Sequence, residues 1–137
     1  PPVYNWRYGI PNANRLPSYI NLKKGLKILE IPISTLQLTG FNFPIGGGAY
    51  FRIYPYFFIK KCIKYLEDKQ EKYNMYIHPW ELDPDHPKIN LPFRVSSTHY
   101  FNLSSTEVKL KSLVENFKFS TYKEVYCNLI KSMSVSD

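Results

Sequence analysis

A chain of 137 residues has room for one domain with a buried core, and its apolar content of 44% excludes disorder over most of its length. The formal charge is +7, but the lysines are scattered, which favours solvated helix faces over a nucleic-acid-binding tail. No apolar run is long enough to span a bilayer, so no transmembrane segment is expected.

The N-terminal third of the chain is expected to be extended and rich in loops. Residues 1–25 contain prolines, a glycine and asparagines that leave no room for a long helix. A short β-type run at 26–31 stops at Pro32, and residues 35–38 continue the extended structure. The chain begins with proline instead of methionine, which indicates a piece of something longer.

Three consecutive glycines at 46–48 permit close backbone approaches that side chains would block. They lack the GK[ST] of a phosphate-binding loop and the spaced glycines of a dinucleotide fingerprint. A tight crossover loop and a ligand-facing loop both stay open, the second because Tyr50 and Arg52 follow directly.

The next segment predicts a helix from Pro55 to Gln70. Proline is harmless in a first turn, and apolar residues recur at helical spacing. The expected buried stripe consists of Ile59, Cys62, Ile63 and Leu66. Cys62 is expected to behave as a small hydrophobe, and a disulfide with Cys127 stays open.

Beyond this helix, residues 74–77 form an apolar strand that delivers His78. A second helix is expected over 103–117, with a capping box of Ser104 and Glu107 and a staple of Leu103 and Val108. Its expected apolar stripe consists of Leu110, Leu113, Val114 and Phe117.

The C-terminal part predicts a minimal strand at 118–120 and a last helix from Thr121, with Glu124 three residues on as in a capping box. Residues 134–137 are expected to fray. The alternation of strands and helices over 26–133 predicts βα units and a parallel sheet. Three strands cannot close a barrel, so the expected fold is an α/β architecture that is incomplete in this chain.

Residues 78–87 are the strongest candidate for chemistry. His78 follows a strand, where an imidazole can act as general acid or base, although a structural histidine is the competing interpretation. Trp80 would stack on a sugar or fill the core. Glu81 and Asp83 would orient a ligand or belong to a rigid, proline-rich turn.

The remaining polar residues of this region give weaker signals. Asp83-Pro84-Asp85 has the DxD form of metal-dependent glycosyltransferases, without any other sign of a nucleotide-sugar domain. A metal site of His78, Asp85 and His86 lacks a recognisable spacing. His86 and His99 are expected to be exposed and unspecialised.

Six ordered motifs run along the chain: RYGIP at 7–11, EIP at 30–32, GGGAYFRIYP at 46–55, YIHPWELDP at 76–84, HYFNL at 99–103 and FKF at 117–119. Together they resemble the C-terminal portion of bacterial polysaccharide deacetylases of the NodB type. The subgroup is the one found with exopolysaccharide and exosortase systems, whose C-terminal region is described as a domain of unknown function.

The resemblance implies the last βα units of a deformed (β/α) barrel that removes an acetyl group from a glycan. The family's metal ligands, an Asp and two His, and its general-base Asp lie in motifs of the N-terminal half that have no counterpart among these residues. His78 matches the family's late histidine, the general acid that protonates the leaving amine. Tyr76 departs from the apolar residue that lines the family's acetyl pocket. The expected substrate-binding residues are Tyr76, Trp80, Glu81, Gly47, Gly48, Tyr50 and Arg52.

The same resemblance supplies the expected partners. These are an N-acetylated polysaccharide and the N-terminal catalytic half of the same protein, which would hold a divalent metal, zinc being favoured. This chain is expected to bind no metal and to be inactive alone. No nucleic-acid partner is expected. A homodimer through an exposed sheet edge stays open. The protein would be bacterial, located either in the cytoplasm or at the cell envelope. The alternative is a non-catalytic glycan-binding or scaffold module that uses Trp80, Tyr50 and Arg52.

Overall fold

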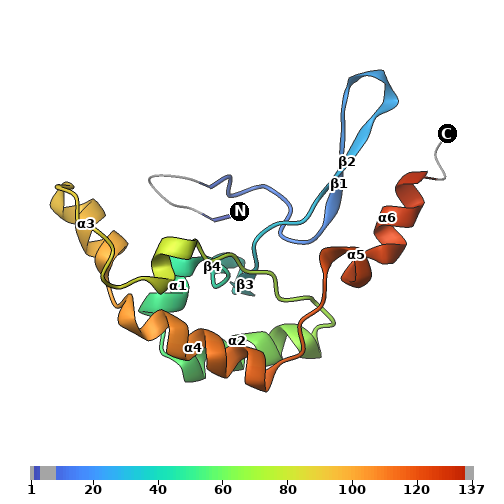
Figure 1. Ribbon diagram of the computed structural model, residues 1–137. Helices are drawn as coiled ribbons and strands as arrows, with labels where there is room; N and C mark the ends of the chain where they lie inside the picture. Colours follow the sequence, from blue (N-terminus) through green and yellow to red (C-terminus); the bar gives the residue numbers. More distant parts are fainter. Residues whose placement is uncertain (1, 4–8, 135–137) are drawn as a thin grey trace.

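The computed structural model describes residues 2–3 and 9–134 of the protein, a mixture of helices and two small sheets that is compatible with an α/β class (Figure 1). Arg7 and Tyr8 of the first motif and residues 135–137 of the expected tail lie outside the described residues. None of the helices in the described ranges is long and apolar enough to cross a membrane.

Both sheets are antiparallel hairpins, which corrects the expectation of a parallel sheet. Strand β1 (Ser18–Asn21) pairs with β2 (Lys27–Glu30), and β3 (Thr35–Leu38) pairs with β4 (Phe41–Pro44). The connections are too short for a crossover, so each can only reverse the chain. Thr39 and Gly40 both have positive φ, 49° and 85°, as a two-residue hairpin turn with the correct twist requires.

The expected strands at 26–31 and 35–38 are therefore confirmed as β2 and β3, but β1 lies within the segment expected to be loop. The expected strand at 74–77 is reduced to one parallel bridge between Gly47 and Tyr76. Residues 118–120 form no strand.

Helix α2 (Tyr56–Asp68) follows the sequence prediction closely. Pro55 caps it in extended geometry, and all four residues of the expected stripe are buried. The helix stops because Gln70 takes the left-handed conformation, with φ of 59°, and the Glu71 N–H bonds back to the Leu66 carbonyl at 2.9 Å. The other helical elements are η1 (Lys23–Gly25), α1 (Gly48–Ile53), η2 (Pro79–Leu82), α3 (Phe93–Tyr100), α4 (Ser104–Asn116), α5 (Tyr122–Val125) and α6 (Cys127–Ser134).

The two expected capping boxes have opposite outcomes. Thr121 and Glu124 form theirs at the start of α5. Ser104 and Glu107 do not, because Leu103 already has helical angles and Glu107 pairs with Lys111 at 2.7 Å instead. The last helix is also divided at Tyr126 into α5 and α6.

The core consists of two apolar clusters that meet on α2. On one side Cys62 and Leu66 pack with Leu36 and Ile45 of the β3–β4 region. On the other side Ile59 and Ile63 pack with Phe51 of α1 and Leu113 of α4. Helix α2 thus holds both the β3–β4 hairpin and the α1–α4 pair, since each buried side chain of this size contributes about 1.5–3 kcal/mol. Val114, expected in the α4 stripe, is exposed.

Candidate functional site

The extended segment 74–77 carries His78 from the core to the surface. Its buried start is fixed by Asn74, whose backbone N–H donates to Ser34 Oγ at 2.7 Å and whose side-chain amide donates to the Pro32 carbonyl at 2.8 Å. The Tyr76 N–H donates to the Gly46 carbonyl at 3.0 Å. Pro79 follows, which favours the extended angles that His78 adopts, and the His78 side chain is exposed.

A buried ion pair lies directly beneath His78. Glu81 accepts from Arg52 Nε at 2.9 Å, both side chains are 2% exposed, and the other Glu81 oxygen accepts from the His78 N–H at 3.1 Å. Arg52 Nη1 also donates to the carbonyls of His99 and Phe101 at 2.8 Å each. One guanidinium therefore ties α1, η2 and the end of α3 together, and the backbone of His78 is held by the same network.

The glycines at 46–48 make this arrangement sterically feasible. A Cβ at Gly48 would collide with both carboxylate oxygens of Glu81, and a Cβ at Gly46 would collide with the Asn74 carbonyl. All three glycines are buried, and Gly48 begins helix α1. Gly46 and Gly48 therefore permit the close packing that the sequence led us to expect, against the Asn74 backbone and the Glu81 side chain.

Aromatic and imidazole rings gather beside His78 and above Arg52. The Trp80 ring stacks on His99 with centroids 4.0 Å apart, and the Arg52 guanidinium lies 5.4 Å from the Trp80 ring. His86 stacks on Tyr100 and contacts both Trp80 and His99 edge-on. We call this group the ring cluster; its members are Tyr76, His78, Trp80, His86, His99 and Tyr100.

The structure corrects the expectation for two histidines. His86 and His99 are partly buried in the ring cluster, because the loop after η2 folds back and α3 returns the chain to Trp80. Burial lowers the pKa of His99, and repulsion from His86 and Arg52 lowers it further, against a weaker opposite effect of Glu81. The neutral form of His99 is therefore favoured.

A small cavity of about 120 Å³ lies beside the segment that leads to His78. Three expected site residues, Gly47, Tyr50 and Tyr76, line it together with Ile33, Ser34, Thr35 and Pro44. The hydroxyl of Thr35 is buried and has no hydrogen-bond partner among the described residues. The β3 and β4 residues of the lining could not be found from the sequence, because only the folded hairpin brings them next to Tyr76.

The expected site residues therefore lie together in one region, but their side chains differ in solvent exposure. His78 and Tyr76 are exposed, Trp80 and Tyr50 are partly buried, and Arg52 and Glu81 are enclosed. Burial, helped by the charges of Glu81 and Tyr50, raises the pKa of the Tyr76 hydroxyl, which keeps it protonated.

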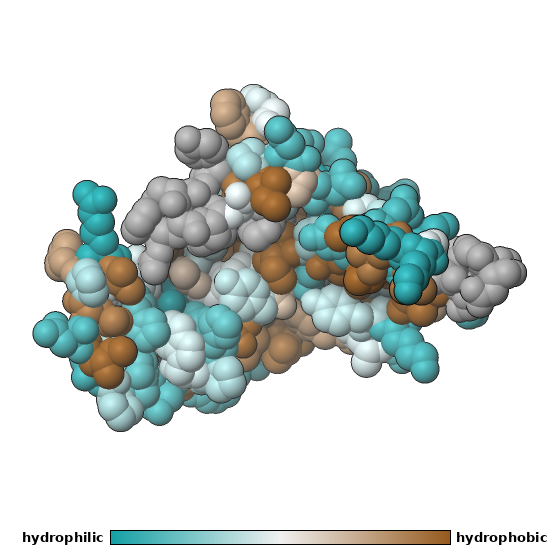
Figure 2. Space-filling model, turned by 90° about the horizontal axis from the view of Figure 1, so that it is seen from above, coloured by the Kyte–Doolittle hydropathy of each residue, from teal (hydrophilic) through white to brown (hydrophobic). Residues whose placement is uncertain are grey.

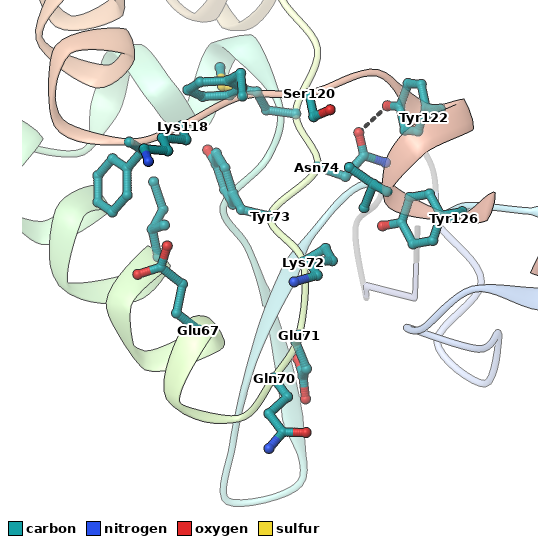
Figure 3. A pocket seen from close by; sticks show the side chains of 15 residues that line it. Glu67, Gln70, Glu71, Lys72, Tyr73, Asn74, Lys118, Ser120, Tyr122 and Tyr126 are labelled. Atoms are coloured by element: carbon teal, nitrogen blue, oxygen red, sulfur yellow. Dashed lines mark hydrogen bonds between the residues drawn. The ribbon is translucent and has the colours of Figure 1, made fainter. Parts of the chain in front are cut away.

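A larger hollow of about 550 Å³ lies away from His78, between the end of α2, residues 70–75 and residues 117–126 (Figure 3). The Tyr122 hydroxyl donates to Asn74 across it (Figure 3). The Tyr73 hydroxyl donates to the Ile45 carbonyl at 3.0 Å, and burial raises the pKa of Tyr73. The hollow contains none of the expected site residues.

The described part of the chain offers no group of three His, Cys, Asp or Glu side chains for a metal ion. A site from His78, Asp85 and His86, which the sequence left conceivable, is accordingly not formed. Asp85 is exposed, and the His86 ring is turned toward the Asp83 carbonyl, with its Nδ1 at 2.6 Å. The two cysteines are free; Cys62 is buried, and burial raises the pKa of its thiol.

Comparison with known proteins gives one match. A family model described as "Domain of unknown function (DUF3473)" matches residues 1–127. Searches of the curated proteins and of the solved structures found no match.

Proposed function

The chain belongs to the family described as Domain of unknown function (DUF3473), and we propose that it is the C-terminal part of a metal-dependent polysaccharide deacetylase. It would contribute the last βα units of a deformed (β/α) barrel and one wall of the groove for an N-acetylated glycan. The observation that carries the proposal is the position of His78. Its side chain is exposed at the end of an extended segment, and its backbone is held by the enclosed Arg52–Glu81 pair.

In the proposed reaction His78 is the general acid. Water adds to the acetyl carbonyl carbon while the general-base Asp expected in the N-terminal half takes one of its protons. The C–N bond then breaks and the imidazolium gives its proton to the leaving nitrogen, so that acetic acid and a free amine result. Such assistance is worth roughly 10²–10⁴ in rate. The described residues offer no group of three side chains for a metal ion, so the proposal assigns the divalent metal to the N-terminal half.

The small cavity supports the proposal through its size and lining. A volume of about 120 Å³ accommodates a group as small as acetyl, and most of its wall is apolar or backbone. The unpartnered Thr35 hydroxyl would donate to the acetyl oxygen, which removes the cost of leaving a buried polar atom unpaired. Tyr76 stands where the family has an apolar residue and lines the cavity. The raised pKa of its hydroxyl keeps the side chain uncharged there.

Arg52 and Glu81 are positioning residues in this proposal, although the sequence prediction placed them against substrate. Side chains that are 2% exposed cannot touch a polysaccharide. Trp80 is only partly buried and lies next to His78, with ring centroids 6.0 Å apart, so it is the better candidate for stacking on a sugar ring.

A non-catalytic glycan-binding module is the second candidate. The ring cluster favours it, because adjacent rings at a surface suit the faces of sugars whether or not a reaction follows. In that case His78 would be one more contact to the glycan.

One comparison separates the two candidates. His78→Gln is introduced into the polypeptide that joins this chain to its proposed metal-binding half, and acetate release and retention on immobilised N-acetylated glycan are both measured. His86→Gln serves as the control, because His86 is held in the ring cluster. The deacetylase proposal expects a loss of roughly 10²–10⁴ in turnover for His78→Gln alone, with retention unchanged. Unchanged turnover with lost retention would establish the binding module instead.

A further inference from the structure

The β1–β2 hairpin has one apolar face that is open to solvent. Ile20 and Ile28 lie opposite each other in the antiparallel register, and Leu22 and Leu26 continue the alternation at the hairpin end, where the Leu22 N–H donates to the Leu26 carbonyl at 2.7 Å. These four residues, which we call the hairpin face, are between 44% and 63% exposed. Exposure of this extent for four neighbouring large aliphatic side chains indicates a surface that is covered by something.

The opposite face of the hairpin is the one turned toward the protein. The Tyr19 hydroxyl donates to the Leu129 carbonyl of α6, and Leu29, which pairs with Tyr19, is partly buried. Because successive side chains of a strand point to opposite faces, the hairpin face is directed away from α6. The hairpin itself projects from the rest of the protein beside α6 (Figure 1).

The tip of the hairpin is strongly cationic. Lys23 and Lys24 form the turn, Lys27 follows in β2, and all three are exposed. Glu30, at the base, is the one carboxylate between residues 18 and 30. None of the three lysines pairs with a carboxylate in the described ranges. Seen from above, the side of the molecule where the hairpin lies shows hydrophobic side chains next to hydrophilic ones (Figure 2).

We propose that this hairpin is a membrane-surface anchor, which inserts the hairpin face among the headgroups of an anionic lipid bilayer while its lysines contact the lipid phosphates. Exposed aliphatic residues next to lysines are the combination that binds such an interface, since burial of apolar area and attraction to anionic lipid add together. Charge favours this occupant over a second copy of the chain or a soluble polyanion. A second copy of the chain would present the same lysines, and a soluble polyanion would leave the hairpin face uncovered.

The test is co-sedimentation of the full chain with vesicles of phosphatidylcholine alone and with equimolar phosphatidylcholine and phosphatidylglycerol. We expect binding to the anionic vesicles only, weakened by added salt. Replacing Lys23, Lys24 and Lys27 by Gln should lower the partition coefficient on the order of 100-fold, from the known contribution of single lysines near an anionic surface. A matched variant with Lys61, Lys64 and Lys123 replaced by Gln has the same net charge and should change it by less than about 3-fold.

The apolar part of the proposal has its own pair of variants. Leu22→Ser with Leu26→Ser should also abolish sedimentation, whereas Ile89→Ser with Val108→Ser, at least as exposed but outside the hairpin, should not. All four leucine, isoleucine and valine positions are exposed, so circular dichroism should show an unchanged fold. Failure to bind anionic vesicles, equal effects of the matched variants, or a dimer that the Leu22 and Leu26 changes dissociate would each overturn the proposal.

Discussion

Replacement of Arg52 by Ala tests whether one buried guanidinium holds the site together. The substitution leaves the Glu81 carboxylate enclosed, with the His78 N–H still donating to it at 3.1 Å, and it removes the donors to the carbonyls of His99 and Phe101. Truncation of one partner of a buried ion pair costs about 3–5 kcal/mol. A domain of this size has a total stability of about 5–15 kcal/mol, so the loss is a large fraction of it.

The assay is urea unfolding followed by far-ultraviolet circular dichroism, with the free energy of unfolding obtained by linear extrapolation. Lys111→Ala is the control, because Lys111 also pairs with a glutamate but lies on the open surface of α4, and we expect no measurable change for it. A second variant, Arg52→Met with Glu81→Leu, replaces the pair by apolar side chains of similar volume. It should recover most of the stability, because no charge is then left buried.

Two results would contradict this role of the Arg52–Glu81 pair. If Arg52→Ala lowers the free energy of unfolding by less than about 1 kcal/mol, the pair is not the buried, desolvated interaction that its 2% exposure indicates. If the apolar double variant is as unstable as Arg52→Ala, the loss comes from the packing of α1 against η2 or from the His99 and Phe101 carbonyls, which lose their donor in both variants, and not from an unpaired carboxylate.

Two further predictions concern a cap and a histidine. Thr121→Ala should lower the free energy of unfolding by about 1 kcal/mol, because the Thr121 hydroxyl accepts a hydrogen bond from the Glu124 N–H. Ser104→Ala should have a negligible effect, since Ser104 does not cap its helix. Urea unfolding of both variants makes the comparison. The pKa of His99 is lowered on folding, so the unfolded chain binds more protons than the folded protein below about pH 6.5. The free energy of unfolding should therefore fall as the pH drops through that value. In a series of unfolding curves at different pH, His99→Gln should make this fall less steep. If the free energy of unfolding of His99→Gln falls with pH as steeply as that of the unchanged protein, the burial of this ring does not control the loss of stability in acid.

The proposed anchor and the proposed chemistry can be tested independently. The hairpin face lies on β1 and β2, whereas His78 and the small cavity involve β3, β4 and the segment 74–77. Changes at the hairpin tip should therefore leave the His78 site intact, and a failed vesicle experiment would say nothing against the deacetylase proposal.

Local patterns predicted the elements that depend on local physics. The spacing of apolar residues was enough for α2, because a helix with one buried stripe must repeat them every three or four residues. The Thr121 cap and strands β2 and β3 were also predicted from the sequence. The predicted cap at Ser104 was wrong, because Leu103 before it already has helical angles. Helix α1 was not predicted, because it begins in a run of glycines, which are poor helix formers.

The candidate site shows the same division. From its own residues the sequence determined that His78 follows an extended segment, that glycines cluster at 46–48, and that aromatic and acidic side chains follow His78. Tertiary structure alone decided that Glu81 lies against Gly48 and pairs with Arg52, that Thr35 lines the cavity beside Tyr76, and that the sheets are antiparallel. The physical reason is that charge pairing, steric fit and strand direction are contacts between segments far apart in the chain, and they have no period or spacing that the sequence can display.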